Sequence, residues 1–352
     1  MTTSSVHPCN LALEPVAERL RRVIDVHFDP RGGSAFWLER QQARGIDARR
    51  DVRHPDDLHL LGDMTPEMFQ QRPLRDFIPR RFHQDLASFL VGQTGGTTGP
   101  GAWSAWRTDE FRAAFVDPFL AAAAHLNFPT AATWLYVGPS GPHIIGKVVR
   151  HLARGLDSHD PFSVDFDPRW ARRLPDGSFA QQRYLEHVVD QAMAVIDLQP
   201  VEVIFTTPAV LARLGERMSE TQRHAIRGVH YGGMPLTAEA LHTFQAHTFP
   251  GAIHVSGYGN TLLGCCLELS AAPGRELEYF PHGSRLLLET DEDRRVRVTR
   301  LDESTLIVRM LERDVGELVP APADAPAGFH LPGLRNPHSP RTIAPRQATG
   351  LY

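Results

Sequence analysis

The feature that most restricts the fold of this chain is a short apolar run, closed by turn-forming residues, that recurs between helical segments. Five such runs stand at positions 89–91, 134–137, 201–205, 229–231 and 253–255. Each is followed at once by glycine, threonine or serine, residues that commonly end strands in turns. Strands that alternate with helices predict an α/β architecture whose sheets are largely parallel and flanked by helices.

Helical periodicity fills the intervals between these runs. Residues 179–198 form a long amphipathic pattern, and residues 219–222 have the Ser-x-x-Gln spacing of a capping box. Thr108 precedes another periodic segment and is the expected N-cap, with Pro118 expected to kink that helix. Residues 1–85 contain helical stretches in an otherwise irregular pattern and indicate no function.

The pattern changes after residue 284. Three strand-like runs follow, at 285–289, 295–299 and 305–309, and they predict a small antiparallel sheet or barrel. From Pro320 onward the sequence holds seven prolines and no sustained periodicity. Sequence of this kind predicts an extended or partly disordered tail.

Composition excludes several classes of protein. The net charge of −4 gives no basic surface for a nucleic acid. The cysteines, Cys9, Cys265 and Cys266, lack the number and spacing of a disulfide framework or a zinc site. No run approaches the roughly 18 apolar residues of a membrane span, and no signal segment is recognisable. We therefore expect a cytoplasmic protein that binds neither membrane nor nucleic acid and has no metal-ligand cluster.

The most informative motif is a glycine- and threonine-rich loop directly after the first apolar run. It contains Thr94, Gly95, Gly96, Thr97, Thr98 and Gly99. Glycines bring backbone N–H groups close to a ligand, and threonine hydroxyls can donate to phosphate oxygens. The loop has no lysine for a P-loop and lacks the G-x-G-x-x-G spacing of a dinucleotide-binding turn. It predicts a phosphate-binding loop of another kind, with a flexible glycine turn as the alternative.

This loop resembles the Ser/Thr-Gly-Thr-Thr-Gly signature of the adenylate-forming superfamily of acyl-CoA synthetases, peptide-synthetase adenylation domains and firefly luciferase. Three further segments resemble motifs of that superfamily, in the same order. They are the His-x-x-Gly of 142–146, the Gly-Gly-Met-Pro-Leu turn of 232–236 and the Tyr-Gly-Asn-Thr of 256–261.

The resemblance implies the large N-terminal domain of these enzymes, in which parallel sheets flanked by helices are joined to a small antiparallel β subdomain. Residues 1–85 would be its helical or irregular part, 86–283 its ATP- and acyl-binding subdomains, 284–319 the antiparallel subdomain and 320–352 a proline-rich tail. Full-length relatives continue with a small C-terminal domain that supplies a lysine. Only the tail follows Glu317 here, and it contains no lysine, so that domain is expected to be absent.

The resemblance also implies a role for each motif. Nucleotide binding would fall to Thr94, Gly95, Gly96, Thr97, Thr98, Gly99, Gly232, Gly233, Met234, Tyr258, Gly259, Asn260, Thr261, Asp314 and Glu317. Among these, Tyr258 would stack on adenine, and Thr261 would contact the α-phosphate as a catalytic residue. The acid would be bound by His143, Gly146, Thr207, Gly232 and Gly257. His143 would lie over the carboxylate as the second catalytic residue, with helix capping as its alternative role.

The sequence departs from the superfamily pattern near the phosphates and the ribose. Leu262 stands where a glutamate usually helps to hold Mg²⁺, and leucine cannot ligate a hard cation. ATP and Mg²⁺ remain the expected cofactors, with the metal held by water and phosphate alone or with weak turnover. Glu317 takes the usual ribose-binding position, with Asp314 as a nearby alternative. Lys147, the only lysine, is expected on a helix surface.

Two stretches, 138–143 and 165–170, resemble the phenylacetate-CoA ligase branch and, within it, short proteins of phenazine biosynthesis. This implies ATP-dependent adenylation of an aromatic, phenazine-type carboxylic acid in antibiotic biosynthesis. The alternatives are diazotisation of an arylamine with nitrite, acyl transfer to CoA or a cysteine, and ligand binding without catalysis. Cys265 and Cys266 lie on a predicted core strand, which favours packing over thiol chemistry. The expected partners are the small aromatic acid and an acceptor enzyme or separate chain, with a homodimer left open.

Overall fold

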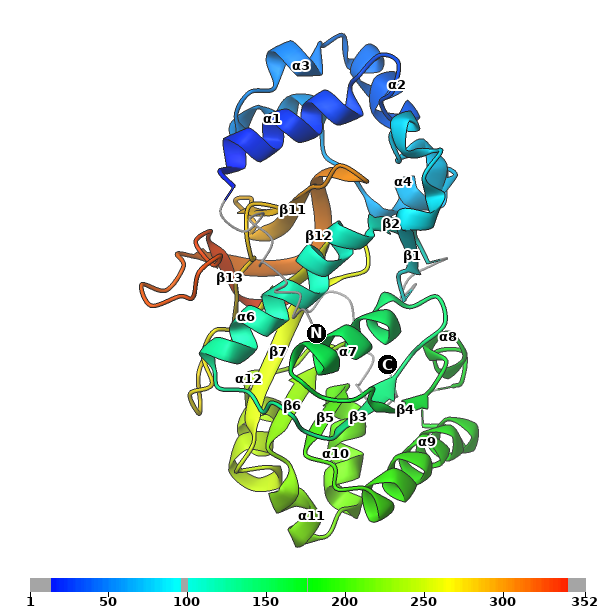
Figure 1. Cartoon of the computed structure of the whole chain (residues 1–352), viewed down its shortest axis with the longest axis vertical. Helices are drawn as coiled ribbons and strands as arrows, with labels where there is room; N and C mark the ends of the chain where they lie inside the picture. The colour runs from blue at the N-terminus through cyan, green and yellow to red at the C-terminus, as the bar shows by residue number, and fades with distance from the viewer. Residues whose placement is uncertain (1–13, 96–100, 176, 341–352) are drawn as a thin grey trace, which may run out of the picture.

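A computed structural model of the chain describes residues 14–95, 101–175 and 177–340. N-terminal helices form one end of the molecule, an antiparallel sheet lies beneath them, and a parallel sheet with its helices forms the other end (Figure 1). The N-terminal helices are α1 (Val16–His27), α2 (Ala35–Arg44), α3 (Ala48–Asp51) and α4 (Pro66–Gln70). The 3₁₀ turns among and after them are η2 (Pro55–Leu61), η3 (Leu74–Asp76), η4 (Arg80–Phe82) and η5 (Leu86–Ser88).

The parallel sheet confirms the α/β architecture that the apolar runs predict. Its strands stand in the order β4-β3-β5-β6-β7-β8. They are β3 (Trp134–Gly138), β4 (Phe162–Asp165), β5 (Val203–Thr206), β6 (Gly228–Tyr231), β7 (Ile253–Asn260) and β8 (Gly264–Leu267). Neighbouring strands pair in parallel, except that β8 runs antiparallel to β7. Four of the predicted runs are confirmed as β3, β5, β6 and β7.

Helices cover both faces of this sheet. Successive residues of a strand point to opposite faces, and in β3 the two sets belong to different core clusters. Leu135 and Val137 pack with the helices α9 (Phe179–Leu198) and α10 (Pro208–Arg217). On the other face, the tryptophan and tyrosine of β3 pack with α6 (Asp117–His125) and α7 (Ile144–Gly155). Burial on both faces explains why these strands read as continuous apolar runs.

Helix boundaries largely follow the local signals. The long amphipathic pattern is confirmed as α9, and the capping box at 219–222 is confirmed at the start of α11 (Glu220–Ala225). The prediction that Thr108 is an N-cap is wrong, because Arg107 occupies that position before α5 (Thr108–Phe111). The Thr108 hydroxyl donates to a carbonyl of η5 instead, so a tertiary contact replaces the local cap.

The remaining helices connect these elements. They are the π-helical turn η6 (Arg112–Val116), α8 (Pro168–Ala171), α12 (Ala238–Thr243) and the second π-helical turn η7 (Phe244–Thr248). The irregularity expected at Pro118 appears as η6, just ahead of the proline, where the helix widens before a residue that has no N–H. Within the described ranges, no helix is both long and apolar enough to cross a membrane.

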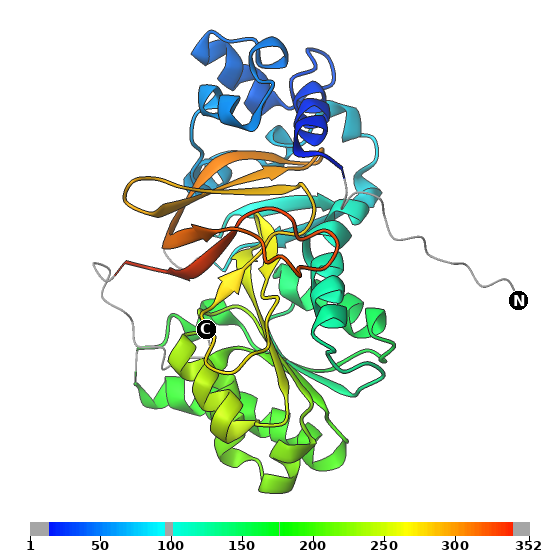
Figure 2. The ribbon, with the colours of Figure 1, turned by 90° about the vertical axis from the view of Figure 1, so that its left-hand side faces the viewer.

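A five-stranded antiparallel sheet lies between the N-terminal helices and the parallel sheet (Figures 1 and 2). Its order is β10-β11-β12-β13-β9. The strands are β9 (Glu278–Tyr279), β10 (Leu286–Thr290), β11 (Arg295–Leu301), β12 (Leu306–Val319) and β13 (Gly333–His338). The three predicted runs are confirmed as β10, β11 and β12. Of the two alternatives predicted for the tail, extended or partly disordered, β13 follows the first, because Leu334 is fully buried between β12 and β9 and its burial fixes the strand there.

The strand before the glycine- and threonine-rich loop is not paired within the parallel sheet, as the repeating pattern predicts, but pairs antiparallel with the next strand along the chain. β1 (Phe89–Gln93) pairs antiparallel with β2 (Trp103–Arg107). Thr94 extends this pairing, since its N–H donates to the Ala102 carbonyl and its Oγ1 accepts from the Ala102 N–H, both at 2.9 Å. The predicted phosphate-binding residues Gly96, Thr97, Thr98 and Gly99 lie outside the described residues.

The N-terminal helices are held by strands from the other end of the sequence. Arg19 of α1 donates through Nε to the carbonyl of Leu301 at 2.8 Å. Trp37 of α2 donates through Nε1 to the carbonyl of Leu306 at 3.1 Å. Leu20 of α1 lies in the same core cluster as both leucines. The first helices therefore share their core with β11 and β12.

Candidate functional site

A cavity of about 130 Å³ opens where the segment after β6 and the end of β7 meet the start of α7. This is the carboxyl edge of the parallel strands, the edge at which open α/β sheets bind ligands. Residues from all four sequence motifs line the cavity: Gly95, His143, Gly232, Gly233, Gly257, Gly259, Asn260 and Thr261. The fold thus brings predicted nucleotide-binding and acid-binding residues to one place.

The inner wall of the cavity is mainly apolar. Side chains from η6, α6, α7 and the sheet form it: Phe115, Phe119, Ile144, Ile145, Val148, Leu152, Phe205 and Leu267. An engineered protein cavity of about 150 Å³, lined by similar side chains, binds benzene. The volume of this cavity therefore suits a single ring or a branched acyl group of similar size.

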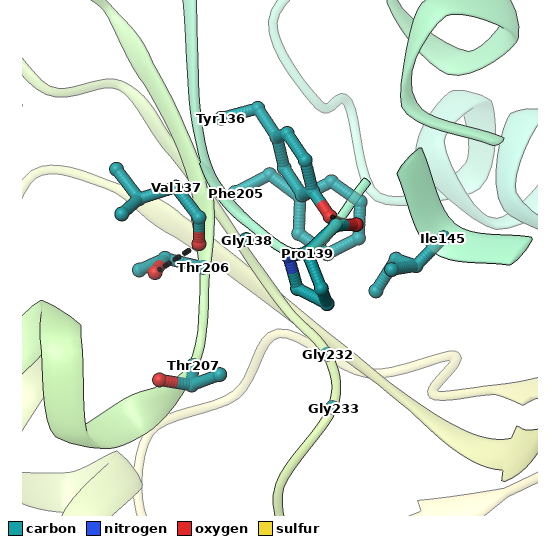
Figure 3. A pocket seen from close by; sticks show the side chains of 10 residues that line it. All are labelled: Tyr136, Val137, Gly138, Pro139, Ile145, Phe205, Thr206, Thr207, Gly232 and Gly233. Atoms are coloured by element: carbon teal, nitrogen blue, oxygen red, sulfur yellow. Dashed lines mark hydrogen bonds between the residues drawn. The ribbon is translucent and has the colours of Figure 1, made fainter. Parts of the chain in front are cut away.

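A second pocket, of about 10 Å³, lies beside the cavity and shares Ile145, Phe205 and the Gly232–Gly233 turn with it (Figure 3). This volume is close to the room that one water molecule needs. Thr207, predicted to bind the acid, lines this smaller pocket rather than the cavity. Its hydroxyl oxygen caps α10 by accepting from the N–H of Val210 at 3.4 Å.

Two neighbouring side chains fix the shape of the smaller pocket. The hydroxyl of Tyr136 donates to the carbonyl of Pro139 at 2.8 Å, which holds the loop after β3. The hydroxyl of Thr206 donates to the carbonyl of Val137 at 2.7 Å, the contact drawn as a dashed line in Figure 3. Both hydroxyls therefore support the pocket wall by binding neighbouring backbone.

His143 stands at the N-cap position of α7, but its side chain makes no capping hydrogen bond. Only 4% of the residue is exposed, and its Nε2 is buried with no hydrogen-bond partner among the described residues. Burial, and then the charge of Arg169, lowers the pKa of His143, so the ring is neutral at neutral pH. A buried polar atom without a partner costs about 1–3 kcal/mol. His143 therefore does not cap α7 through its side chain, and it lines the cavity with its Nε2 enclosed by protein atoms.

Glycines allow the backbone to approach closely at two of the motifs. A Cβ at Gly146 would stand 2.8 Å from Cα of Ser140, so this glycine keeps α7 against the loop after β3. Gly233 has a φ of 80°, a left-handed conformation that glycine adopts without strain. Neither Gly146 nor Met234, the residue after this turn, lines the cavity.

The loop after β1 is joined to the segment that follows α8. A guanidinium N–H of Arg172 donates to the carbonyl of Gly95, which lines the cavity. This contact places a positive charge beside the predicted phosphate-binding loop. Sequence reasoning missed Arg172, although it lies just beyond the stretch at 165–170 that carries the family resemblance.

The two acidic residues predicted for the ribose lie in different surroundings. The hydroxyl of Tyr258 donates to Oδ2 of Asp314 at 3.2 Å, and Oγ of Ser339 donates to Oδ1 at 2.8 Å. Burial and the charge of Asp314 raise the pKa of Tyr258. Glu317 is exposed and lies 3.7 Å from Nη1 of Arg335 on β13, beyond an irregularity in the pairing of β12. The structure therefore brings Asp314, and not Glu317, to the tyrosine motif.

Glu312 is a candidate residue whose role sequence reasoning missed. Nδ2 of Asn260 lies 3.4 Å from its Oε1, while Oδ1 of Asn260 accepts from the N–H of Leu262 at 2.9 Å. Burial and the charge of Asp314 raise the pKa of Glu312 to about 7. Its position two residues before Asp314 on one strand is the signal that could have identified it.

Leu262 is buried, with 2% exposure, and its carbonyl accepts from Arg300 at 2.8 Å. Its side chain belongs to the core, so it offers nothing to a cation. Across the residues that the structure describes, no three His, Cys, Asp or Glu side chains gather to hold a metal ion. These residues do not form a protein-held Mg²⁺ site, and no chemical role for the metal follows from them.

A buried ionic cluster holds the loop that carries Thr261 from behind. Trp106, Arg300 and Arg285 donate to the carbonyls of residues 261–263 in turn, at 3.2, 2.8 and 3.0 Å. Asp302 joins the two arginines, accepting from Arg300 at 2.7 Å and from Arg285 at 2.6 Å. Although burial acts to raise the pKa of Asp302, the arginines hold it well below its usual range. Sequence reasoning did not identify this cluster.

The prediction of core packing is confirmed for Cys266 but not for Cys265, which is only partly buried, while the single lysine lies on a helix as predicted. Cys266 is buried in the core, and Cys265 lines the cavity. Burial raises the pKa of Cys265 to about 12 and raises that of Cys266 as well. Both thiols are therefore protonated at neutral pH, which makes them weak nucleophiles. Lys147 is partly exposed on α7 and lies outside the cavity wall.

No protein-family model matches the chain, and no curated protein matches it significantly in sequence. Solved structures of 2-hydroxyisobutyryl-CoA ligase do match it. A complex with 2-HIB-AMP and CoA gives a TM-score of 0.63 at 13% identity, covering 95% of this chain and 72% of the ligase. An open conformation with the same ligands gives 0.62 at 13% identity, covering 91% and 72%. The postadenylation state with 2-HIB-AMP gives 0.62 at 12% identity, covering 91% and 65%. The chain therefore has the fold of the N-terminal domain of adenylate-forming enzymes.

Proposed function

We propose that the chain catalyses the ATP-dependent adenylation of a compact carboxylic acid to an acyl-AMP. The observation that carries this proposal is the single cavity that all four motifs line, with glycine-rich segments beside an apolar chamber. The shared fold supports it, because the matched ligase structures hold 2-HIB-AMP, an acyl-adenylate. Both ATP and the acid would bind at this edge of the sheet.

The reaction requires a carboxylate oxygen of the acid to attack the α-phosphorus of ATP. A bond forms between that oxygen and the α-phosphorus, while the bond to the oxygen that bridges to the β-phosphate breaks. The electron pair of the broken bond leaves with pyrophosphate. The protein contributes mainly by positioning the two reactants and by stabilising charge on the phosphate.

Residues on the cavity wall suit these tasks. A neutral His143 can donate one N–H to the carboxylate oxygen that does not attack. The hydroxyl of Thr261 is assigned to the α-phosphate, since its backbone is fixed by Trp106 and its residue lines the cavity. Asp314 is assigned to the ribose hydroxyls and Tyr258 to the adenine, because the two side chains already contact each other.

The volume and the lining of the cavity favour a particular size of acid. Aromatic rings of Phe115, Phe119 and Phe205 surround the inner part, which suits a flat ring. A phenazine has three fused rings, whereas a volume of about 130 Å³ corresponds to one. We therefore assign the substrate to single-ring aromatic carboxylic acids. Transfer of the acyl group to Cys265 or Cys266 is disfavoured because both thiols remain protonated.

The test is exchange of labelled pyrophosphate into ATP by the full chain, with a panel of benzoates, hydroxybenzoates, aminobenzoates and phenazine carboxylates. We expect exchange that depends on a single-ring acid. Thr261→Val, which removes the hydroxyl at nearly constant volume, should lower the rate about 100-fold. Thr243→Val, on the exposed side of α12, is the matched control and should leave the rate unchanged. ATP binding without exchange for any acid would show a binding protein and overturn the proposal.

A further inference from the structure

His230 is a polar side chain within the apolar part of the cavity. It lies on β6, two residues before Gly232, and its ring lines the cavity. Because a strand rises about 3.3 Å per residue, the ring lies roughly 6–7 Å deeper in the sheet than the glycine turn. Its centroid is 4.5 Å from that of Phe119 and 4.3 Å from that of Phe205.

One contact fixes which nitrogen of His230 carries the proton. Nδ1 lies 2.9 Å from the carbonyl oxygen of Val255 on the neighbouring strand β7. A carbonyl can only accept a hydrogen bond, so Nδ1 must be the protonated nitrogen. Burial lowers the pKa of His230 to about 4, which keeps the ring neutral at neutral pH. Nε2 therefore has a free lone pair and can only accept a hydrogen bond.

Nε2 of His230 has no hydrogen-bond partner within the described ranges, and unlike Nε2 of His143 it is not sealed by protein atoms. The residue is 6% exposed, and the space beside it is the cavity. His254 on β7 provides a contrast, because both of its nitrogens are partnered, by the hydroxyl of Tyr231 at 2.6 Å and the carbonyl of Phe249 at 3.2 Å. Buried nitrogens of native proteins normally have such partners. The unpartnered Nε2 of His230 is therefore available to accept a hydrogen bond from a ligand.

The polar groups of the cavity thus fall into two sets. His143, Asn260 and Thr261 belong to the motifs at the carboxyl edge of the sheet, whereas His230 lies deeper among phenylalanine rings. An acid whose carboxylate lies at the edge directs its ring toward His230. An apolar substituent there would leave the lone pair unsatisfied, and an anionic substituent would be repelled by it.

We infer that the acid carries a hydrogen-bond donor, a hydroxyl or an amino group, on the part of its ring remote from the carboxylate, and that Nε2 of His230 accepts from it. This inference rests on the proposed adenylation function and narrows its substrate class to hydroxy- and amino-substituted benzoates. His230 is then a specificity-determining residue. A site built to bind a substrate hydroxyl or amine rejects the analogue that lacks it far more strongly than an apolar pocket rejects a missing methyl group.

The test compares kcat/KM in pyrophosphate exchange for acids that differ only in the donor. The pairs are 4-hydroxybenzoate with 4-methylbenzoate, 4-aminobenzoate with 4-methylbenzoate, and the corresponding 3-substituted acids. In the wild type we expect a preference of about 100-fold or more for the donor-bearing acid of at least one pair. His230→Phe retains an aromatic ring without the acceptor and should reduce that preference to below about 10-fold, chiefly by slowing the donor-bearing acid.

The controls separate this inference from the proposed function. His151→Phe makes the same replacement on α7 outside the cavity and should keep the wild-type preference. If no acid supports exchange, the adenylation function itself fails. If exchange occurs but the wild type does not distinguish the paired acids, or His230→Phe keeps the preference, adenylation stands and the role of His230 is overturned. Should His230→Phe not fold, the comparison of acids in the wild type still decides.

Discussion

The loop at residues 261–263 separates two regions that differ in how their polar atoms are satisfied. Behind the loop, each of the five N–H donors of Arg300 has an acceptor, supplied by Asp302, two serines and two carbonyls. In front of it, Nε2 of His143 and Nε2 of His230 have no partner among the described residues. Behind the loop, Arg300 is fully satisfied without a ligand, and of the two arginines that bind the loop only Arg285 has an unpartnered nitrogen, its Nε, among the described residues. In front of the loop, the two unpartnered nitrogens belong to residues that line the cavity.

This difference predicts which substitutions should lower the stability of the protein and which should lower its activity. Polar groups that are buried and partnered hold the backbone in place, so replacing them should unfold the protein. Polar groups that are buried without partners are destabilising until a ligand binds, so replacing them should affect binding and catalysis with little loss of stability. Substitutions on the two sides of the loop should therefore produce effects of different kinds.

The largest expected effect is a loss of stability when the ionic cluster behind the loop is disrupted. Asp302→Asn keeps the volume of the side chain but leaves Arg300, Arg285 and Arg19 without their shared carboxylate. We expect the free energy of unfolding to fall by about 3–5 kcal/mol, because charges remain buried without compensation. Urea denaturation followed by circular dichroism measures this. A loss below about 1 kcal/mol would contradict the role assigned to the cluster.

The next largest expected effect is a loss of activity when a cavity residue in front of the loop is replaced. His143→Ala removes the donor assigned to the carboxylate, and we expect kcat for pyrophosphate exchange to fall about 100-fold. The free energy of unfolding should stay constant or rise, because a buried nitrogen without a partner is removed. Exchange kinetics and urea denaturation of one preparation measure both quantities. A fall in the free energy of unfolding with an unchanged kcat would show that His143 supports the fold rather than the reaction, and would contradict this assignment.

A smaller effect distinguishes the two acidic residues of β12. Asp314→Asn removes the charge beside Tyr258, and we expect the Kd for ATP to rise about 10-fold through weaker hydrogen bonds to the ribose. Glu317→Gln is the matched control and should change Kd by less than about twofold, because its side chain pairs with Arg335. Isothermal titration calorimetry measures both. The opposite order would assign the ribose to Glu317, as its sequence position predicts.

The smallest effect is a dependence of stability on pH. The pKa of Glu312 is raised from 4.5 to about 7, so its folded state holds a proton that the unfolded state has already lost. Its contribution to stability is complete below about pH 4.5 and is lost as pH rises through about 7. Relative to Glu312→Gln, the wild type should therefore lose about 1 kcal/mol of unfolding free energy between pH 5 and pH 8. A difference that is constant over this range would show that Glu312 is not perturbed.

Much of the fold could be predicted because its signals are local. Strands buried on both faces leave continuous apolar runs, and the capping box of α11 needs only a serine and a glutamine three residues apart. The hairpin of β1 with β2 and the docking of β13 were not predicted. Both depend on pairing between strands, and the position of Leu334 in the core is set by β9 and β12 rather than by its own neighbours in sequence.

The candidate site likewise contains residues that local sequence signals identify and residues that they do not. Its motifs could be found because glycines, threonines and a tyrosine recur at fixed short spacings. Arg300, Asp302 and His230 could not, because each is a single residue that also has partners in distant segments. Arg300, for example, binds the carbonyl of Leu262, 38 residues away, and the hydroxyl of Ser104, 196 residues away. No periodicity in the sequence marks such contacts.

The attachment of the N-terminal helices to β11 and β12 has a consequence for synthesis on the ribosome. Arg19 is translated 282 residues before its acceptor Leu301, and Trp37 is translated 269 residues before Leu306. At a synthesis rate of about 5–20 residues per second, α1 is made roughly 15–60 s before the strands that cover it. During that interval its apolar face, with Leu20 and its neighbours, is available to chaperones and to other nascent chains. The first helices to be made are thus among the last to reach their native contacts.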